Sequence, residues 1–414
     1  MRCAALVTLG LVACSSPEAP GLELRGALPD YGPLAGGTVI VLDGEGLRDA
    51  TRVWIGGREA PFLRALDDTT LEVVIPPGAR PGDAEVVVFG RSSTTTAQGL
   101  FRYSAPPTLT GVSPADVLFS STTTELTITG TGFLDDGAGR VHVLIDGALQ
   151  PSVRVISDSQ LVITAPPGVP LVRPDIEVID DRGTATLTRA YRYRPSLRSG
   201  LLLFPAAGDA LANFYDPVDH SLTTIPIVTP LPWRLTAVVP GPGGDFWGLD
   251  RARRFGRIDT KTTTLEAPRQ LANLLPTITR AGDAYYAIDR IAQRIGRFDP
   301  DTGVFTPIGT NQIPCCGSFG LASDGTTLYF TSRRFLPAGG TQVTINTFDP
   351  TSGGLGTPVV VQGPTLHVEE MRFFNGTLYA SSRDSTLVTI DPATGTVQAV
   401  SIPPATYKAM EVFE

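Results

Sequence analysis

The chain has 414 residues, of which 18% are charged, and its formal net charge is −8. This length allows two to four domains, and the lack of a basic block argues against nucleic acid as a partner. The 44 glycines and 36 prolines are spread among Thr, Val and Leu, a mixture typical of many short strands joined by tight turns. We therefore expect an all-β protein.

The chain opens with the features of an export signal. Arg2 supplies a positive charge, and residues 3–13 form a short apolar run. The run is too short to span a bilayer but fits the apolar region of a secretory signal peptide. We therefore leave residues 1–13 out of the fold.

The signal ends in Leu11-Val12-Ala13-Cys14, and a polar, Pro-containing segment follows. This junction resembles the lipobox of bacterial lipoproteins. The resemblance implies cleavage before Cys14, acylation of that residue, a tether over residues 14–26 and a place in the bacterial cell envelope. Several acyl chains would give stable membrane anchoring. In this family, Ser15 rather than Asp after the cysteine favours the outer membrane. Whether the protein faces the periplasm or the cell surface stays open. The alternative is an ordinary signal peptide with a chance cysteine.

Two copies of one strand pattern follow, over residues 27–104 and 105–195. Short alternating strands lie between Gly, Pro and Asp turns, as a small β-sandwich requires. The copies match at an offset of about 85–90 residues in three places: 39–47 with 125–133, 71–77 with 161–167, and 101–103 with 191–193. We predict two tandem sandwiches.

The shared turns carry a resemblance to a known domain. The first copy opens with Gly32-Pro33 followed by Gly36-Gly37-Thr38, and both copies have a G-x-G turn and a Pro-Pro pair before their last strands. These features resemble the IPT/TIG domain. The resemblance implies an immunoglobulin-like fold and a role as a spacer or binding module.

Residues 196–414 have a different repeat. A hydrophobic-Asp-Pro or hydrophobic-Asp-Thr phrase recurs five times, with its aspartates 43, 40, 50 and 42 residues apart. A period of this length with strand signals alone predicts a β-propeller. Asp, Pro and Gly in these phrases favour a hairpin turn capped by the Asp side chain; metal binding by these carboxylates is the weaker alternative. The aspartates are Asp216, Asp259, Asp299, Asp349 and Asp391.

One stretch of this region, residues 286–299, resembles the NHL-type propeller repeat. The segment after Leu201 lacks an inner strand, whereas residues 408–413 form a spare strand at the C-terminus. This strand can complete the first blade and leave no open edge. We predict five blades, with a sixth between Asp299 and Asp349 as the alternative.

The sequence offers few groups for chemistry. Its three histidines lie apart, and it contains no zinc, phosphate-binding or nucleophile motif. We expect no metal, cofactor or catalytic set. In a propeller, ligands meet the loops that precede the inner strands; Arg234, Glu369 and Glu370 are the candidates there for an ionic ligand. The alternative is a solvated channel mouth.

Cys315 and Cys316 are adjacent. An exported chain meets an oxidising compartment, which makes a vicinal disulfide the first interpretation and two buried thiols the second.

Three functions remain open. The first is a non-enzymatic, membrane-anchored module in which IPT/TIG spacers present a propeller that binds protein or glycan. The second is a propeller enzyme, a lyase or lactonase, with a divalent cation in its channel. The third is a structural role in envelope assembly. The absence of a convergent catalytic set favours the first.

Overall fold

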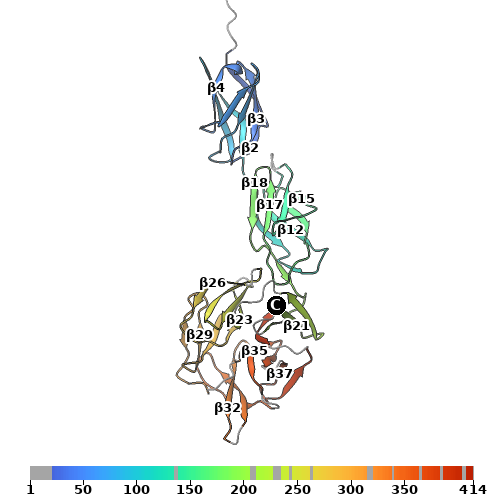
Figure 1. Cartoon of the computed structure of the whole chain (residues 1–414), viewed down its shortest axis with the longest axis vertical. Helices are drawn as coiled ribbons and strands as arrows, with labels where there is room; N and C mark the ends of the chain where they lie inside the picture. Colours follow the sequence, from blue (N-terminus) through green and yellow to red (C-terminus); the bar gives the residue numbers. More distant parts are fainter. Residues whose placement is uncertain are drawn as a thin grey trace, which may run out of the picture. The chain divides into compact units, whose positions relative to one another are not determined.

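A computed structural model describes residues 21–134, 139–205, 211–226, 235–241, 245–261, 264–314, 320–337, 340–362, 366–382, 386–402 and 407–413 (Figure 1). The chain divides into two compact units. The first contains residues up to 115 with 123–165 and 174–191, and the second contains 116–122, 166–173 and 192 onward. In the described part of the chain, no helix is long and apolar enough to cross a membrane.

The first unit begins with a sandwich of two sheets, ordered β1-β3-β7-β6 and β2-β9-β8-β4-β5. Alternate side chains point into one core, where Ile40 and Leu42 of β3 meet Val86 and Val88 of β8 at 0% exposure. The elements are β1 (Glu23–Leu28), β2 (Tyr31–Pro33), β3 (Val39–Glu45), η1 (Leu47–Asp49), β4 (Ala50–Ile55), β5 (Arg58–Glu59), β6 (Phe62–Ala65), β7 (Thr70–Val74), β8 (Gly82–Gly90) and β9 (Thr94–Ser104).

The strand pattern then repeats, with sheets ordered β10-β12-β16-β15 and β14-β13-β17-β18. The repeat extends to irregularities, because the β1–β3 pair is bulged between Leu24 and Gly26 and the β10–β12 pair between Leu109 and Gly111. The strands are β10 (Thr108–Ser113), β12 (Glu125–Thr131), β13 (His142–Ile145), β14 (Ala148–Leu149), β15 (Arg154–Ser157), β16 (Gln160–Thr164), β17 (Ile176–Asp180) and β18 (Gly183–Leu187). β1 begins at Glu23, inside the segment predicted as tether, because its residues pair with β3 from Glu23 onward.

A tyrosine fixes the Pro-Pro turn in both copies. The Tyr103 hydroxyl donates to the Pro76 carbonyl at 2.6 Å, and the Tyr193 hydroxyl donates to the Pro166 carbonyl at 2.7 Å. The residue after each Pro-Pro pair is glycine, because the tyrosine ring occupies the place of a side chain. A Cβ on Gly78 would lie 2.7 Å from the ring of Tyr103.

The second unit starts with the parallel pair β11 (Asp116–Leu118) and β19 (Arg192–Arg194). Five four-stranded antiparallel sheets follow among the residues that the structure describes. Their strands are, sheet by sheet, β20 (Gly200–Pro205), β21 (Leu211–Asp216), β22 (Ser221–Pro226) and β39 (Tyr407–Phe413); β23 (Leu235–Pro240), β24 (Phe246–Asp250), β25 (Arg254–Asp259) and β26 (Thr264–Gln270); β27 (Ile278–Ala281), β28 (Ala284–Asp289), β29 (Arg294–Phe298) and β30 (Phe305–Pro307); β31 (Leu321–Ser323), β32 (Leu328–Phe335), β33 (Thr341–Phe348) and β34 (Val359–Val360); β35 (Val368–Phe374), β36 (Thr377–Ser382), β37 (Leu387–Ile390) and β38 (Val397–Val400).

The five sheets form a closed cycle. Their innermost strands neighbour one another in the order β39, β23, β27, β31, β35 and back to β39. Each pair of neighbouring sheets shares an apolar cluster, including the fifth and first sheets, where Tyr379 and Leu387 meet Leu201 and Tyr215. In Figure 1 the sheets carrying β21, β26, β29, β32 and β37 surround a common centre. We call this arrangement the ring.

The final strand closes the ring as predicted: β39 pairs with β20 along its whole length, from Gly200 with Phe413 to Pro205 with Tyr407. The capped Asp turns are also confirmed. Asp391 accepts the Ala393 amide at 2.9 Å and the Thr394 hydroxyl at 2.8 Å. These hydrogen bonds lower the pKa of Asp391, since they favour the charged carboxylate.

Candidate functional site

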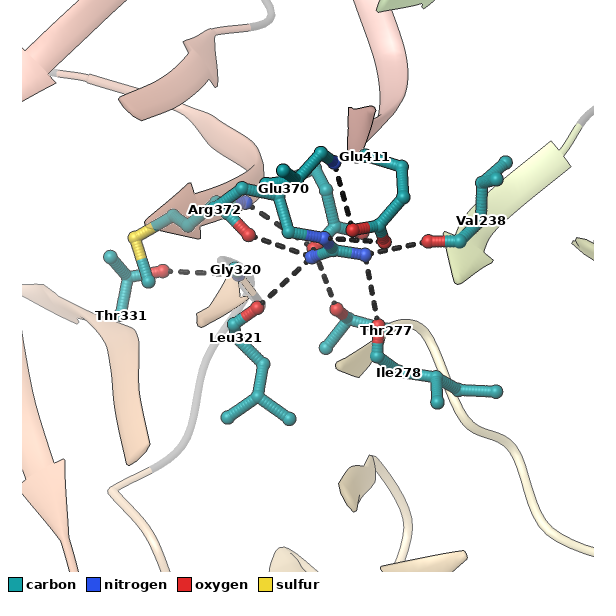
Figure 2. A network of polar contacts seen from close by, with 11 residues as sticks. Val238, Thr277, Ile278, Gly320, Leu321, Thr331, Glu370, Arg372 and Glu411 are labelled. Atoms are coloured by element: carbon teal, nitrogen blue, oxygen red, sulfur yellow. Dashed lines mark hydrogen bonds and ion pairs between the residues drawn. The ribbon is translucent and has the colours of Figure 1, made fainter. Parts of the chain in front are cut away.

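A buried arginine lies at the centre of the ring (Figure 2). Arg372 of β35 is 3% exposed, and its Nε donates to Glu411 Oε2 on β39 at 2.9 Å. Its Nη2 donates to the carbonyls of Val238 on β23 at 2.7 Å and Ile278 on β27 at 3.0 Å. Its Nη1 donates to the Leu321 carbonyl on β31 at 3.2 Å. One side chain therefore holds partners on the innermost strands of the other four sheets.

Glu370 is the second charged member of this axial network. Its Oε1 accepts Arg372 Nη1 at 2.6 Å and the Thr277 hydroxyl at 2.8 Å, and both Glu370 and Thr277 are 0% exposed. Burial raises the pKa of Glu370 to about 7, although the positive charge of Arg372 acts in the opposite direction. Desolvation outweighs the ion pair here because no water reaches the carboxylate.

Glu411 completes the network. Its Oε1 accepts the Val412 amide at 2.8 Å, while its Oε2 takes the Arg372 Nε. Burial also raises the pKa of Glu411. Two carboxylates thus share one guanidinium, so the network carries one net negative charge when both are ionised.

A cavity of about 650 Å³ opens against this network, at the C-terminal ends of the innermost strands. Arg372 and Glu411 form part of its wall, and three phenylalanines line it from β24, β35 and β39. Phe246 and Phe413 stack with their ring centroids 6.2 Å apart. We call this the axial cavity. The lining residues are Arg192, Pro240, Gly241, Asp245, Phe246, Thr279, Arg280, Gly282, Ser323, Arg372, Phe373, Glu411, Val412 and Phe413.

Two other charged residues of the cavity lining are held by neighbours. Asp245 lies 3.3 Å from Arg173 Nε and 3.3 Å from Arg257 Nη1. Arg280 donates from Nε to the Gly282 carbonyl at 2.7 Å. The lining therefore holds both donors and acceptors in fixed positions.

The predicted channel residues are not all brought together. Glu369, near the start of β35, forms an ion pair with Lys408 Nζ at 2.5 Å, and neither residue lines the axial cavity. Glu370 is buried in the axial network rather than at a solvated mouth. Arg234 lies outside the described residues. Ligand binding by Arg234, Glu369 and Glu370 stays a prediction.

The cysteine predictions fall on Cys14, Cys315 and Cys316, which lie outside the described residues. Within the part of the chain that the structure describes, no group of three or more His, Cys, Asp or Glu side chains is placed to hold a metal ion.

Sequence reasoning missed Arg372 and Glu411. A signal was present, because both innermost strands carry charged residues among apolar ones, VEEMRFF in β35 and YKAMEVF in β39. A charged residue inside such a strand needs a buried partner of opposite charge. The partner backbone carbonyls, by contrast, leave no trace in the sequence.

Comparison with known proteins finds similar sequences for part of the chain. Of the curated relatives, human Plexin-B3 is 36% identical over 90 residues, which are 21% of this chain and 5% of that protein. Plexin-2 of Caenorhabditis elegans is 37% identical over 91 residues. The chain thus spans about 5% of the length of these relatives. Among solved structures, the chain is similar to an auxiliary nutrient binding protein from Bacteroides ovatus. The match covers 92% of this chain and 86% of that protein's chain, with 15% sequence identity and a TM-score of 0.27.

The match to a family model is confined to the sandwiches. The IPT/TIG domain model matches residues 23–103 and 107–193. Both ranges contain the duplicated strands, the repeated bulge and the tyrosine contact described above. The prediction of two such domains is confirmed, and the chain carries two IPT/TIG domains in tandem.

Proposed function

We propose that this chain is an exported, lipid-anchored, non-enzymatic binding protein of the bacterial cell envelope. Two IPT/TIG domains act as spacers, and the ring is a five-bladed β-propeller whose axial cavity takes the ligand. The observation that carries the proposal is the cavity itself, about 650 Å³ with aromatic and charged lining. This volume and this mixture are those of small-molecule and oligomer binding sites.

The propeller assignment is supported by the closed cycle of innermost strands and by the pairing of β39 with β20. A propeller places one four-stranded sheet in each blade and often borrows a terminal strand to close the first. Five sheets with this connectivity favour five blades over six.

The anchor is supported by the sequence around Cys14 alone. Its test is direct: Cys14→Ala in the full-length chain should abolish fatty-acid labelling and release the protein from the membrane fraction. Retention of both would refute the anchor, and labelling in the inner membrane fraction would refute the outer-membrane assignment.

The alternative is a propeller enzyme with a divalent cation in its channel. The axial network argues against a divalent cation beside Arg372. The guanidinium already occupies the axis and is paired with Glu370 and Glu411, the carboxylates that a cation would need. A divalent ion placed beside it would meet a positive charge in a medium of low dielectric constant.

The proposal is tested with the full mature chain as bait in envelope extracts containing both protein and glycan. Ser323→Tyr puts a bulky side chain at the cavity wall and should prevent capture of the partner. Ser352→Tyr is the matched control, since both serines form side-chain hydrogen bonds within a turn, Ser323 with the Gly325 amide and Ser352 with Asp349, but Ser352 does not line the cavity. Capture that both variants retain, or no capture by the wild-type chain, would refute binding at this site. Metal-dependent turnover of a lactone would favour the enzyme instead.

A further inference from the structure

We propose that the axial cavity selects an uncharged, hydroxyl-rich ligand, a neutral glycan, over acidic or amine-bearing ones. The inference rests on the proposed binding function and adds the chemical class of the ligand. The ligand class follows from the hydrogen-bond donors and acceptors of the cavity wall that are not already used within the protein.

The wall offers no free donor from Arg372. An arginine has five N–H groups. Here Nε donates to Glu411, Nη2 donates to the carbonyls of Val238 and Ile278, and Nη1 donates to Glu370 and to the Leu321 carbonyl (Figure 2). The positive group that would otherwise receive a carboxylate or phosphate is therefore fully used within the protein.

Glu411 gives the same wall an acceptor. Each of its oxygens takes one protein hydrogen bond, and a carboxylate oxygen can accept a second. The side chain is 5% exposed and lines the cavity. An acidic ligand would meet this carboxylate at close range, whereas a hydroxyl group can donate to it. The wall therefore favours O–H donors and disfavours anions.

Amine-bearing ligands meet the opposite problem. Arg192, Arg280 and Arg372 line the cavity against the two carboxylates of Asp245 and Glu411. An ammonium group attracted to Glu411 would lie beside the Arg372 guanidinium, whose Nε is 2.9 Å from that carboxylate. Excluding both signs of charge leaves a neutral ligand with hydroxyl groups, because the charged pairs still provide donors and acceptors for hydroxyls.

Phenylalanine side chains supply the apolar part of the lining. Phe246, Phe373 and Phe413 come from three different strands, and the Phe413 ring is fixed by contacts with Phe246 at 6.2 Å and with the guanidinium of Arg192 at 4.7 Å. Rigid aromatic surfaces beside a few fixed polar groups give orientation and specificity. The cavity volume of about 650 Å³ leaves room for more than one sugar ring.

The test is calorimetric titration of the full mature chain with three defined sets of oligosaccharides: neutral glucose, xylose and mannose oligomers, uronic-acid oligomers, and chitosan oligomers. We expect binding within the neutral set alone. Glu411→Gln should weaken that binding about tenfold, the effect of replacing a charged acceptor by a neutral one, and should reduce the discrimination against uronic acids. Arg280→Ala should reduce the discrimination against chitosan oligomers. Glu125→Gln makes the same chemical change in the second sandwich, where Glu125 pairs with Arg154, and should leave all affinities unchanged.

The outcomes separate this inference from the proposed function. Preference for acidic or amino oligomers, or binding that neither Glu411→Gln nor Arg280→Ala alters, would overturn the ligand class or its site. Absence of binding to every oligomer would overturn the inference even where the pull-down recovers a protein that Ser323→Tyr blocks, and in that case the binding function stands. If Glu411→Gln does not fold, as judged by circular dichroism, Arg280→Ala alone decides the matter.

Discussion

Arg372→Met is the most informative single change in the ring. Methionine keeps an unbranched apolar stem but lacks the guanidinium, so it leaves Glu370 and Glu411 buried without a cation, along with carbonyls on three other strands. Removing one partner of a buried ion pair costs about 3–5 kcal/mol. We expect a loss of stability in this range, large for a single substitution.

The two units make a single unfolding midpoint ambiguous, so the assay is hydrogen exchange followed by mass spectrometry at pH 7.5. Amides of β23, β27, β31 and β35 should exchange about two to four orders of magnitude faster in Arg372→Met. Strand β3 of the first unit should be unchanged and serves as an internal control. Arg198→Met removes an arginine that is 55% exposed and paired with Asp219 in the same unit, and should cost less than about 1 kcal/mol.

A triple variant identifies the cause. If unpaired carboxylates produce the loss, then Arg372→Met combined with Glu370→Gln and Glu411→Gln should recover about 2 kcal/mol, since neutral amides tolerate burial better. A change of less than about 0.5 kcal/mol in Arg372→Met, or no recovery in the triple variant, would refute this reasoning about the axial network.

Three further predictions follow from particular contacts. Burial raises the pKa of Glu370 from 4.5 to about 7. This carboxyl group therefore stabilises the ring fully below pH 4.5, and the stabilisation is lost as the pH rises through 7. The free energy of unfolding should be lower at pH 8.5 than at pH 5.5, and Glu370→Gln should reduce this difference. Gly78→Ala places a Cβ 2.7 Å from the Tyr103 ring and should lower the melting temperature of the first sandwich, whereas Gly57→Ala, where a Cβ meets nothing within 4 Å, costs only the strain of its positive φ. Deletion of residues 407–414 removes β39 and exposes the β20 edge, so the product should aggregate in light scattering; a monomeric product would contradict the role of β39 in closure.

The parts of this fold that sequence reasoning found are those written in local or repeated patterns. The duplicated sandwich, the capped turn at Asp391 and the closing strand ending at Phe413 each follow from spacing within one segment or between copies. The start of β1 at Glu23 was missed, because the polar, Pro-containing run after Cys14 was taken for a tether that continues to residue 26. The axial network was missed for a different reason: Val238, Ile278 and Leu321 act through backbone carbonyls, which any residue type provides.

The axial network also links folding to ligand binding. A buried ion cluster is weak support for stability, because desolvation offsets much of its attraction; what it adds here is position, since the planar fork of Arg372 fixes carbonyls from three strands and a carboxylate from a fourth. Glu411, the acceptor in the cavity wall, belongs to β39, the strand that closes the ring. A ring without β39 therefore lacks both its edge partner and the wall of its cavity. Ligand that binds Glu411 should in turn slow the exchange of β39 amides, because it binds only the closed ring.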